Sequence, residues 1–132
     1  MLYDHVDFRV GSVAKARPLY DALLAAMGYT DLHSDADAVG YHRPNEVGGD
    51  AFFWIVEERS HHPNGTRVAF GARSRAEVDC LSQIAKDAGA RAFEAAHLCT
   101  DYGPNYYASF FEDAEGNKLE ICCRRPNDSS SA

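Results

Sequence analysis

The chain has 132 residues, of which 45% are hydrophobic and 25% charged, and this is the composition of one ordinary globular domain. Its 20 acidic and 13 basic residues give a formal net charge of −7, which disfavours binding to nucleic acid or to an anionic membrane surface. No segment approaches the roughly 18 consecutive apolar residues of a membrane span, and the first residues lack the features of a secretory signal, so we expect a cytoplasmic protein.

The first half of the chain predicts a strand, a helix and three further strands. In the first strand, residues 3–10, apolar residues alternate with polar ones, so His5, Asp7 and Arg9 should share the face that points away from the helices. Ser12 fits the N-cap of a helix over 12–27, and Gly28 fits its end. The remaining strands are expected at 30–34, 39–42 and 51–57, with a loop at 43–50.

The second half predicts the same order of elements. Ser74, with Glu77 three residues later, has the spacing of a capping box that opens a helix over 74–88, and Gly89 follows it. A loop is expected at 96–105, a hairpin turn at 113–117 and a disordered C-terminal tail at 124–132. The predicted strands cover 66–72, 91–95, 106–112 and 118–123.

These two halves read as an internal repeat. The segment that begins at His5 is echoed by one that begins at Arg67, an offset of 62 residues (67 minus 5), and Ser12 and Ser74 keep that offset. Repeated strand–helix units that pack together leave a cleft between them. The repeat therefore predicts two similar modules with a candidate binding site in the cleft.

The turn and strand at 113–120 carry the most distinctive pattern, D-x-x-G-N-x-x-E. Together with the repeat, the histidine in the first strand and the pair Tyr106-Tyr107, this pattern resembles the vicinal oxygen chelate superfamily of glyoxalases, bleomycin resistance proteins and extradiol dioxygenases. The resemblance implies an α+β fold of two tandem βαβββ modules whose curled mixed sheets enclose a cleft. It also implies a single domain over 1–123, with modules at about 2–58 and 66–123, and a homodimer.

The metal positions of that superfamily fall on His5, Arg67 and Glu120. In relatives that use a metal, such residues hold a divalent ion such as zinc, nickel, manganese or iron, and here the implied ligands are His5 and Glu120. Arg67 stands where another histidine is usual, and a guanidinium has no lone pair to donate to a metal. Arg67 therefore argues against the usual metal and favours an ion pair with Glu120. His61 and His62, on the connecting loop, stay open as replacement ligands.

Two functions remain open. The first is an enzyme of lyase, isomerase or dioxygenase type that acts on a small oxygen-rich or electrophilic metabolite, with His5, Arg67 and Glu120 as catalytic residues. The second is a non-catalytic protein that binds a small molecule for sequestration or resistance. Arg67, Tyr107 and Trp54 are the candidate substrate-binding residues, although Trp54 also fits the core and either Tyr106 or Tyr107 can line the cleft.

Overall fold

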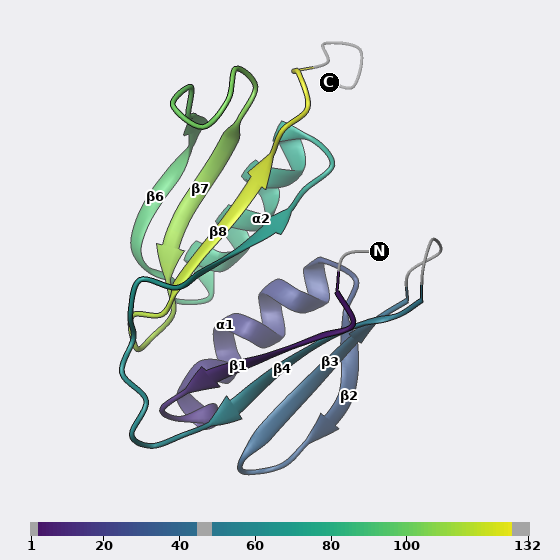
Figure 1. The fold of residues 1–132 in the computed structure, drawn as a ribbon, viewed down its shortest axis with the longest axis vertical. Helices are drawn as coiled ribbons and strands as arrows, with labels where there is room; N and C mark the ends of the chain where they lie inside the picture. The colour runs from purple at the N-terminus through teal and green to yellow at the C-terminus, as the bar shows by residue number, and fades with distance from the viewer. Residues whose placement is uncertain (1–2, 45–48, 128–132) are drawn as a thin grey trace. The chain divides into compact units, whose positions relative to one another are not determined.

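The computed structural model describes residues 3–44 and 49–127, and these form two compact units with the boundary between His62 and Pro63. Each unit is a four-stranded sheet with one helix on one of its faces (Figure 1). No helix among these residues is long and apolar enough to cross a membrane.

The first unit contains five elements, and its sheet has the order β1-β4-β3-β2. Strand β1 pairs parallel with β4, while β3 pairs antiparallel with both β4 and β2. The elements are β1 (His5–Val10), α1 (Val13–Ala26), β2 (Thr30–Ser34), β3 (Ala38–Arg43) and β4 (Ala51–Glu57).

The second unit repeats this arrangement with the order β5-β8-β7-β6, again with one parallel pair, β5 with β8. Its elements are β5 (Arg67–Gly71), α2 (Arg75–Asp87), β6 (Arg91–Leu98), β7 (Tyr107–Glu112) and β8 (Lys118–Cys123). The two orders are identical, so the predicted α+β class and the tandem βαβββ repeat are confirmed. That the sheets enclose a common cleft stays a prediction.

Alternation along the strands decides which face of each sheet meets its helix. In β1, Phe8 and Val10 are buried whereas His5, Asp7 and Arg9 are exposed, as expected. In β8, Leu119 and Ile121 are fully buried on the face that α2 covers. Burying these apolar side chains drives each helix onto its sheet and leaves the opposite face of the sheet open.

The predicted helix ends are confirmed. Ser12 Oγ accepts the backbone N–H of Lys15 at 3.2 Å, and Ser74 Oγ accepts that of Glu77 at 3.1 Å. Gly28 and Gly89 follow the two helices with φ angles of 89° and 101°, the left-handed conformation that ends many helices.

One predicted loop is partly wrong, because β6 continues to Leu98 where a loop over 96–105 was expected. Residues 97 and 98 pair with Ala108 and Tyr107 of β7, so their backbone groups are satisfied in the ladder. Apolar alternation could not predict this extension, because β6 is an edge strand with few buried positions and two register shifts. Within the loop predicted at 43–50, residues 45–48 lie outside the described residues, as do residues 128–132 of the predicted tail.

Candidate functional site

The open face of the second sheet is built from cross-strand rows of side chains. Glu120 on β8 pairs with Ala69 of β5 and with Phe110 of β7, and Phe110 pairs in turn with Glu94 of β6. A carboxylate in the middle of the sheet is therefore flanked by an aromatic side chain on one strand and by a small side chain on the other.

The turn before β8 fixes the position of Glu120. The carboxylate of Asp113, 1% exposed, accepts the backbone N–H groups of Glu115 and Asn117 and the side-chain amide of Asn117 at 2.8–3.0 Å. Gly116 has a φ of 100°, which favours glycine. The D-x-x-G-N part of the motif is thus a hydrogen-bonded turn, and it sets the register that points Glu120 to the open face.

Glu120 is only 5% exposed, and its carboxylate accepts a hydrogen bond from the hydroxyl of Tyr106. Burial, together with hydrogen bonds to Cys122 and Glu120, raises the pKa of Tyr106 well above its usual range. Tyr106 therefore stays a protonated donor at any physiological pH. It holds one oxygen of the carboxylate in place.

Two guanidinium groups lie against the aromatic rings of this face. The Cζ atom of Arg67 is 5.0 Å from the ring centre of Phe110, and that of Arg124 is 4.6 Å from the ring centre of Tyr106. The predicted ion pair between Arg67 and Glu120 does not form, and within residues 3–44 and 49–127 neither arginine has a carboxylate partner within 4.0 Å. Both guanidinium groups make cation–π contacts instead, and the N–H groups of these arginines remain available to hydrogen-bond a ligand.

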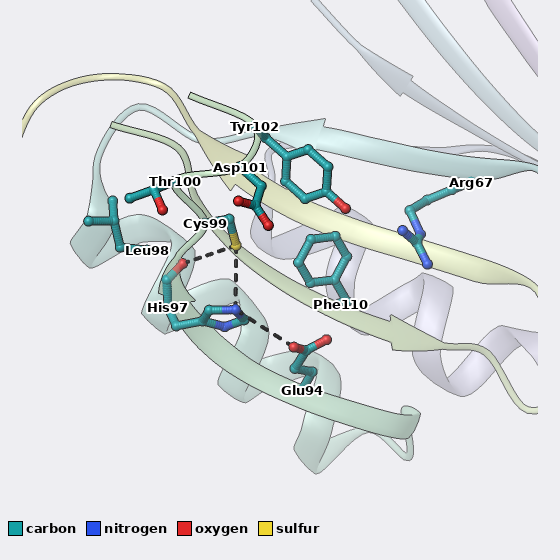
Figure 2. A pocket seen from close by; sticks show the side chains of 9 residues that line it. All are labelled: Arg67, Glu94, His97, Leu98, Cys99, Thr100, Asp101, Tyr102 and Phe110. Atoms are coloured by element: carbon teal, nitrogen blue, oxygen red, sulfur yellow. Dashed lines mark hydrogen bonds and ion pairs between the residues drawn. The ribbon is translucent and has the colours of Figure 1, made fainter. Parts of the chain in front are cut away.

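These residues line a cavity with two lobes. The first lobe, about 260 Å³, contains Glu120, Tyr106 and Arg124. The second lobe, about 380 Å³, extends along β6 and the turn that follows it. The lobes share a wall of Arg67, Tyr102 and Phe110, and Figure 2 shows the Phe110 ring between Arg67 and the side chains of β6.

The second lobe contains a linked thiol, imidazole and carboxylate, which the sequence did not single out. Cys99 Sγ lies 3.5 Å from His97 Nε2, which is 3.7 Å from a carboxylate oxygen of Glu94 (Figure 2). Burial, together with the charges of Glu94 and Glu120, raises the pKa of Cys99. The thiol therefore stays protonated at neutral pH, which argues against a nucleophilic role.

The first unit holds two of the predicted site residues, His5 and Trp54. His5 is exposed on β1 with its Nδ1 2.8 Å from the carboxylate of Asp4, and this hydrogen bond raises the pKa of His5. Trp54 occupies the register position on β4 that Glu120 occupies on β8, opposite Asp7 on one side and Gly40 on the other. Trp54 is thus on the open face, whereas Phe53 is in the core.

Tyr106 and Tyr107 point to opposite faces, as predicted. Tyr107 donates to Asp79 of α2 at 2.7 Å, with the guanidinium of Arg75 over its ring, so it lies on the helix side of the sheet. Tyr106 is the tyrosine beside Glu120. A substrate-binding role for Tyr107 stays a prediction. Tyr102 and Arg124 were missed because one lies in the turn after β6 and the other follows the last strand.

The donor set of the second unit does not fit a divalent ion. No group of three histidine, cysteine or acidic residues suited to a metal occurs among residues 3–44 and 49–127. Glu120 is already bonded to Tyr106, and Arg67 brings a positive charge to the same cavity. His5 belongs to the first unit, so a metal held by His5 and Glu120, or by His61 or His62, stays a prediction.

Solved structures share this fold. A glyoxalase/bleomycin resistance protein from Albidiferax ferrireducens T118 is 21% identical over 95% of this chain and 100% of its own, with a TM-score of 0.74. A proposed glyoxalase from Bacillus halodurans is 29% identical over 92% and 95%, with a TM-score of 0.69. FosX, a fosfomycin resistance protein from Listeria monocytogenes, is 15% identical over 93% of each chain, with a TM-score of 0.67.

No protein-family model and no curated protein matches the chain. The structural neighbours are glyoxalase, bleomycin resistance and related proteins, so the fold that the sequence resemblance implied is confirmed. At these identities the likeness establishes the fold, while the chemistry depends on the residues of the site.

Proposed function

We propose that this chain, which has the fold of the glyoxalase and bleomycin resistance proteins, acts on a small oxygen-rich or electrophilic metabolite by lyase- or isomerase-type proton transfer. One observation carries the proposal: the buried carboxylate of Glu120 shares a cavity with the guanidinium of Arg67. Such chemistry uses a carboxylate that accepts a proton and a nearby cation that stabilises an oxyanion.

Each residue then has a separate role. Glu120 takes a proton from carbon or from an attacking water through the oxygen that Tyr106 does not hold. Arg67 stabilises the negative charge that develops on the substrate oxygen. Tyr106 is a positioning residue, because its raised pKa prevents it from acting as a base. His5 remains the candidate second acid or base of the first unit.

A metal-dependent version of this reaction would need ligands that the second unit does not provide. We therefore derive no step through a metal.

Two probes test the proposal. Proton NMR in D₂O follows exchange of the hydrogens on the carbon beside the carbonyl of dihydroxyacetone. Phosphorus NMR follows opening of the epoxide of fosfomycin, the compound to which FosX gives resistance. We expect the wild-type protein to accelerate one of these reactions and Glu120→Gln to abolish the acceleration. Glu112→Gln is the matched control. Glu112 is on the same open face of the sheet as Glu120, but its carboxylate lies 3.7 Å from the ammonium group of Lys118. Equal rates for the wild type and Glu120→Gln contradict a base role.

The aromatic wall favours a second candidate, a protein that binds a small molecule without changing it. Tyr102 lies 5.5 Å from Tyr106 and 6.5 Å from Phe110, measured between ring centres, and the three rings offer apolar contact area. Fosfomycin that binds in ligand-observed NMR but is recovered unchanged, with Glu120→Gln binding equally well, would support this alternative.

A further inference from the structure

The positive charge of the first lobe exceeds what Glu120 can balance. Arg67 and Arg124 contribute two positive charges against the one negative charge of Glu120, and within residues 3–44 and 49–127 neither guanidinium is neutralised by an ion pair. The surplus is local, because the chain as a whole has a net charge of −7. A lobe with one excess positive charge favours a ligand that carries a negative group.

The geometry of Arg124 suits such a group. Its guanidinium lies 4.6 Å from the ring centre of Tyr106, a contact that limits how the planar group can turn. Arg67 is held in the same way on Phe110. Two guanidinium groups that are held in place in this way are well matched to carboxylate, phosphonate or phosphate oxygens.

The second lobe has the opposite character. Glu94 and Asp101 place two carboxylates there, beside His97 and Cys99. An anionic group in that lobe would meet like charges, so the negative end of a ligand belongs beside Arg124. The rings of Tyr102 and Phe110, which both lobes share, would then contact the body of the ligand.

We propose that Arg124 determines specificity for a small acid, whose anionic group lies between Arg67 and Arg124 while its planar or apolar body packs on Tyr102 and Phe110. This inference rests on the proposed function for the location of the site, but it concerns binding and not turnover. It holds for either source of the chemistry, a carboxylic acid or a phosphonic acid.

Binding of simple probes tests it without any reaction. The probes are benzoate, phenylphosphonate, the neutral isostere benzamide and the cation benzylamine, titrated into the wild-type protein and followed by nitrogen–proton correlation NMR. We expect the acids to bind at least about tenfold more tightly than benzamide, because a charge-assisted hydrogen bond is about twice as strong as a neutral one. Benzylamine should bind no better than benzamide.

Variants locate the effect. Arg124→Gln should weaken binding of the acids about tenfold and leave benzamide binding unchanged, and Arg124→Lys should recover part of the loss because it keeps the charge without the planar fork. Arg125→Gln is the matched control, since Arg125 is exposed like Arg124 but does not line either lobe. Circular dichroism checks that each variant is folded.

Three results would overturn the inference: benzamide binding as tightly as the acids, Arg124→Gln binding benzoate like the wild type, or no binding of either acid up to solubility. None of them decides the proposed function, which is judged by the loss of turnover in Glu120→Gln. Conversely, a protein without turnover that still selects acids through Arg124 retains this inference and refutes only the catalytic proposal.

Discussion

At the scale of single residues, the D-x-x-G-N-x-x-E motif has two parts with different roles, a structural turn and the catalytic candidate Glu120. Asp113, Gly116 and Asn117 build a turn, and Glu120, seven residues after Asp113 on β8, is the motif residue that lines the cavity. The bond from Tyr106 then fixes the carboxylate. A buried carboxylate needs such a donor, since an unpaired charge there would be costly.

Tyr106→Phe tests the importance of that donor. We expect a loss of about 1–3 kcal/mol in the free energy of unfolding, because Glu120 would keep its burial and lose a charge-assisted bond. Tyr107→Phe is the matched control on the opposite face, where a more exposed bond to Asp79 is lost, and it should cost about 1 kcal/mol or less. Urea denaturation measures both, and equal losses would contradict the special role of Tyr106.

Trp54 depends on a glycine opposite it. A Cβ atom added at Gly40 would lie 2.6 Å from Cη2 of the indole, so Gly40→Ala must displace the ring. We expect a loss of stability of about 1–3 kcal/mol. Trp54 is the single tryptophan of the chain, so its fluorescence emission should also shift. Gly71→Ala, where an added Cβ meets nothing within 4 Å, should change neither quantity.

At the scale of elements, the turn between β7 and β8 supports the whole open face of the second sheet. The carboxylate of Asp113 is 1% exposed and accepts three hydrogen bonds within the turn. Register errors in a hairpin move side chains to the other face of a sheet, which here would remove Glu120 from the cavity.

Asp113→Ala should therefore destabilise the protein by about 2–4 kcal/mol, since buried N–H groups lose their acceptor. Asp113→Asn keeps one acceptor oxygen and should lose less. Thermal unfolding followed by circular dichroism compares the two variants. If Asp113→Ala melts like the wild type, the motif is not the structural turn described above.

Tyr107 links β7 to α2 and has a measurable titration. The hydrogen bond to Asp79, followed by burial, raises the pKa of Tyr107 to about 12. Because the folded pKa is raised, this contribution to stability is complete below about pH 10, the ordinary tyrosine pKa, and is lost as the pH rises through about 12. Ultraviolet difference titration should show one tyrosine fewer ionising near pH 12 in Tyr107→Phe. An unchanged titration curve would contradict the assignment.

At the scale of the whole molecule, four strands form the edges of the two sheets, namely β1, β2, β5 and β6. Exposed edges are usually covered, and the resemblance implies coverage by a second copy. We predict a homodimer in solution. Multi-angle light scattering at micromolar concentration should give about twice the chain mass, whereas a value near 14.5 kDa would contradict the prediction.

The metal positions give a second prediction at this scale. If His5, Arg67 and Glu120 meet as the resemblance implies, Arg67→His supplies the missing lone pair and should raise zinc or nickel affinity at least about tenfold. Calorimetric titration of the wild type, Arg67→His and the double variant with His5→Ala measures it. Stoichiometric metal on the purified wild type, lost in Glu120→Gln, would show that Arg67 does not prevent binding.

Local signals were enough to predict the elements and their order, apart from the end of β6, because alternation, helix caps and the repeated pattern from His5 and from Arg67 need no long-range contacts. The resemblance also singled out Glu120 and Arg67 as candidate site residues. The tertiary structure decided the rest, because cross-strand contacts join residues far apart in the chain. In the structure, Tyr106 donates a hydrogen bond to Glu120, and the guanidinium of Arg124 lies over the ring of Tyr106. Arg67 lies over the ring of Phe110 instead of forming the expected ion pair. No local pattern encodes such partners, since they depend on register and burial in the packed sheet.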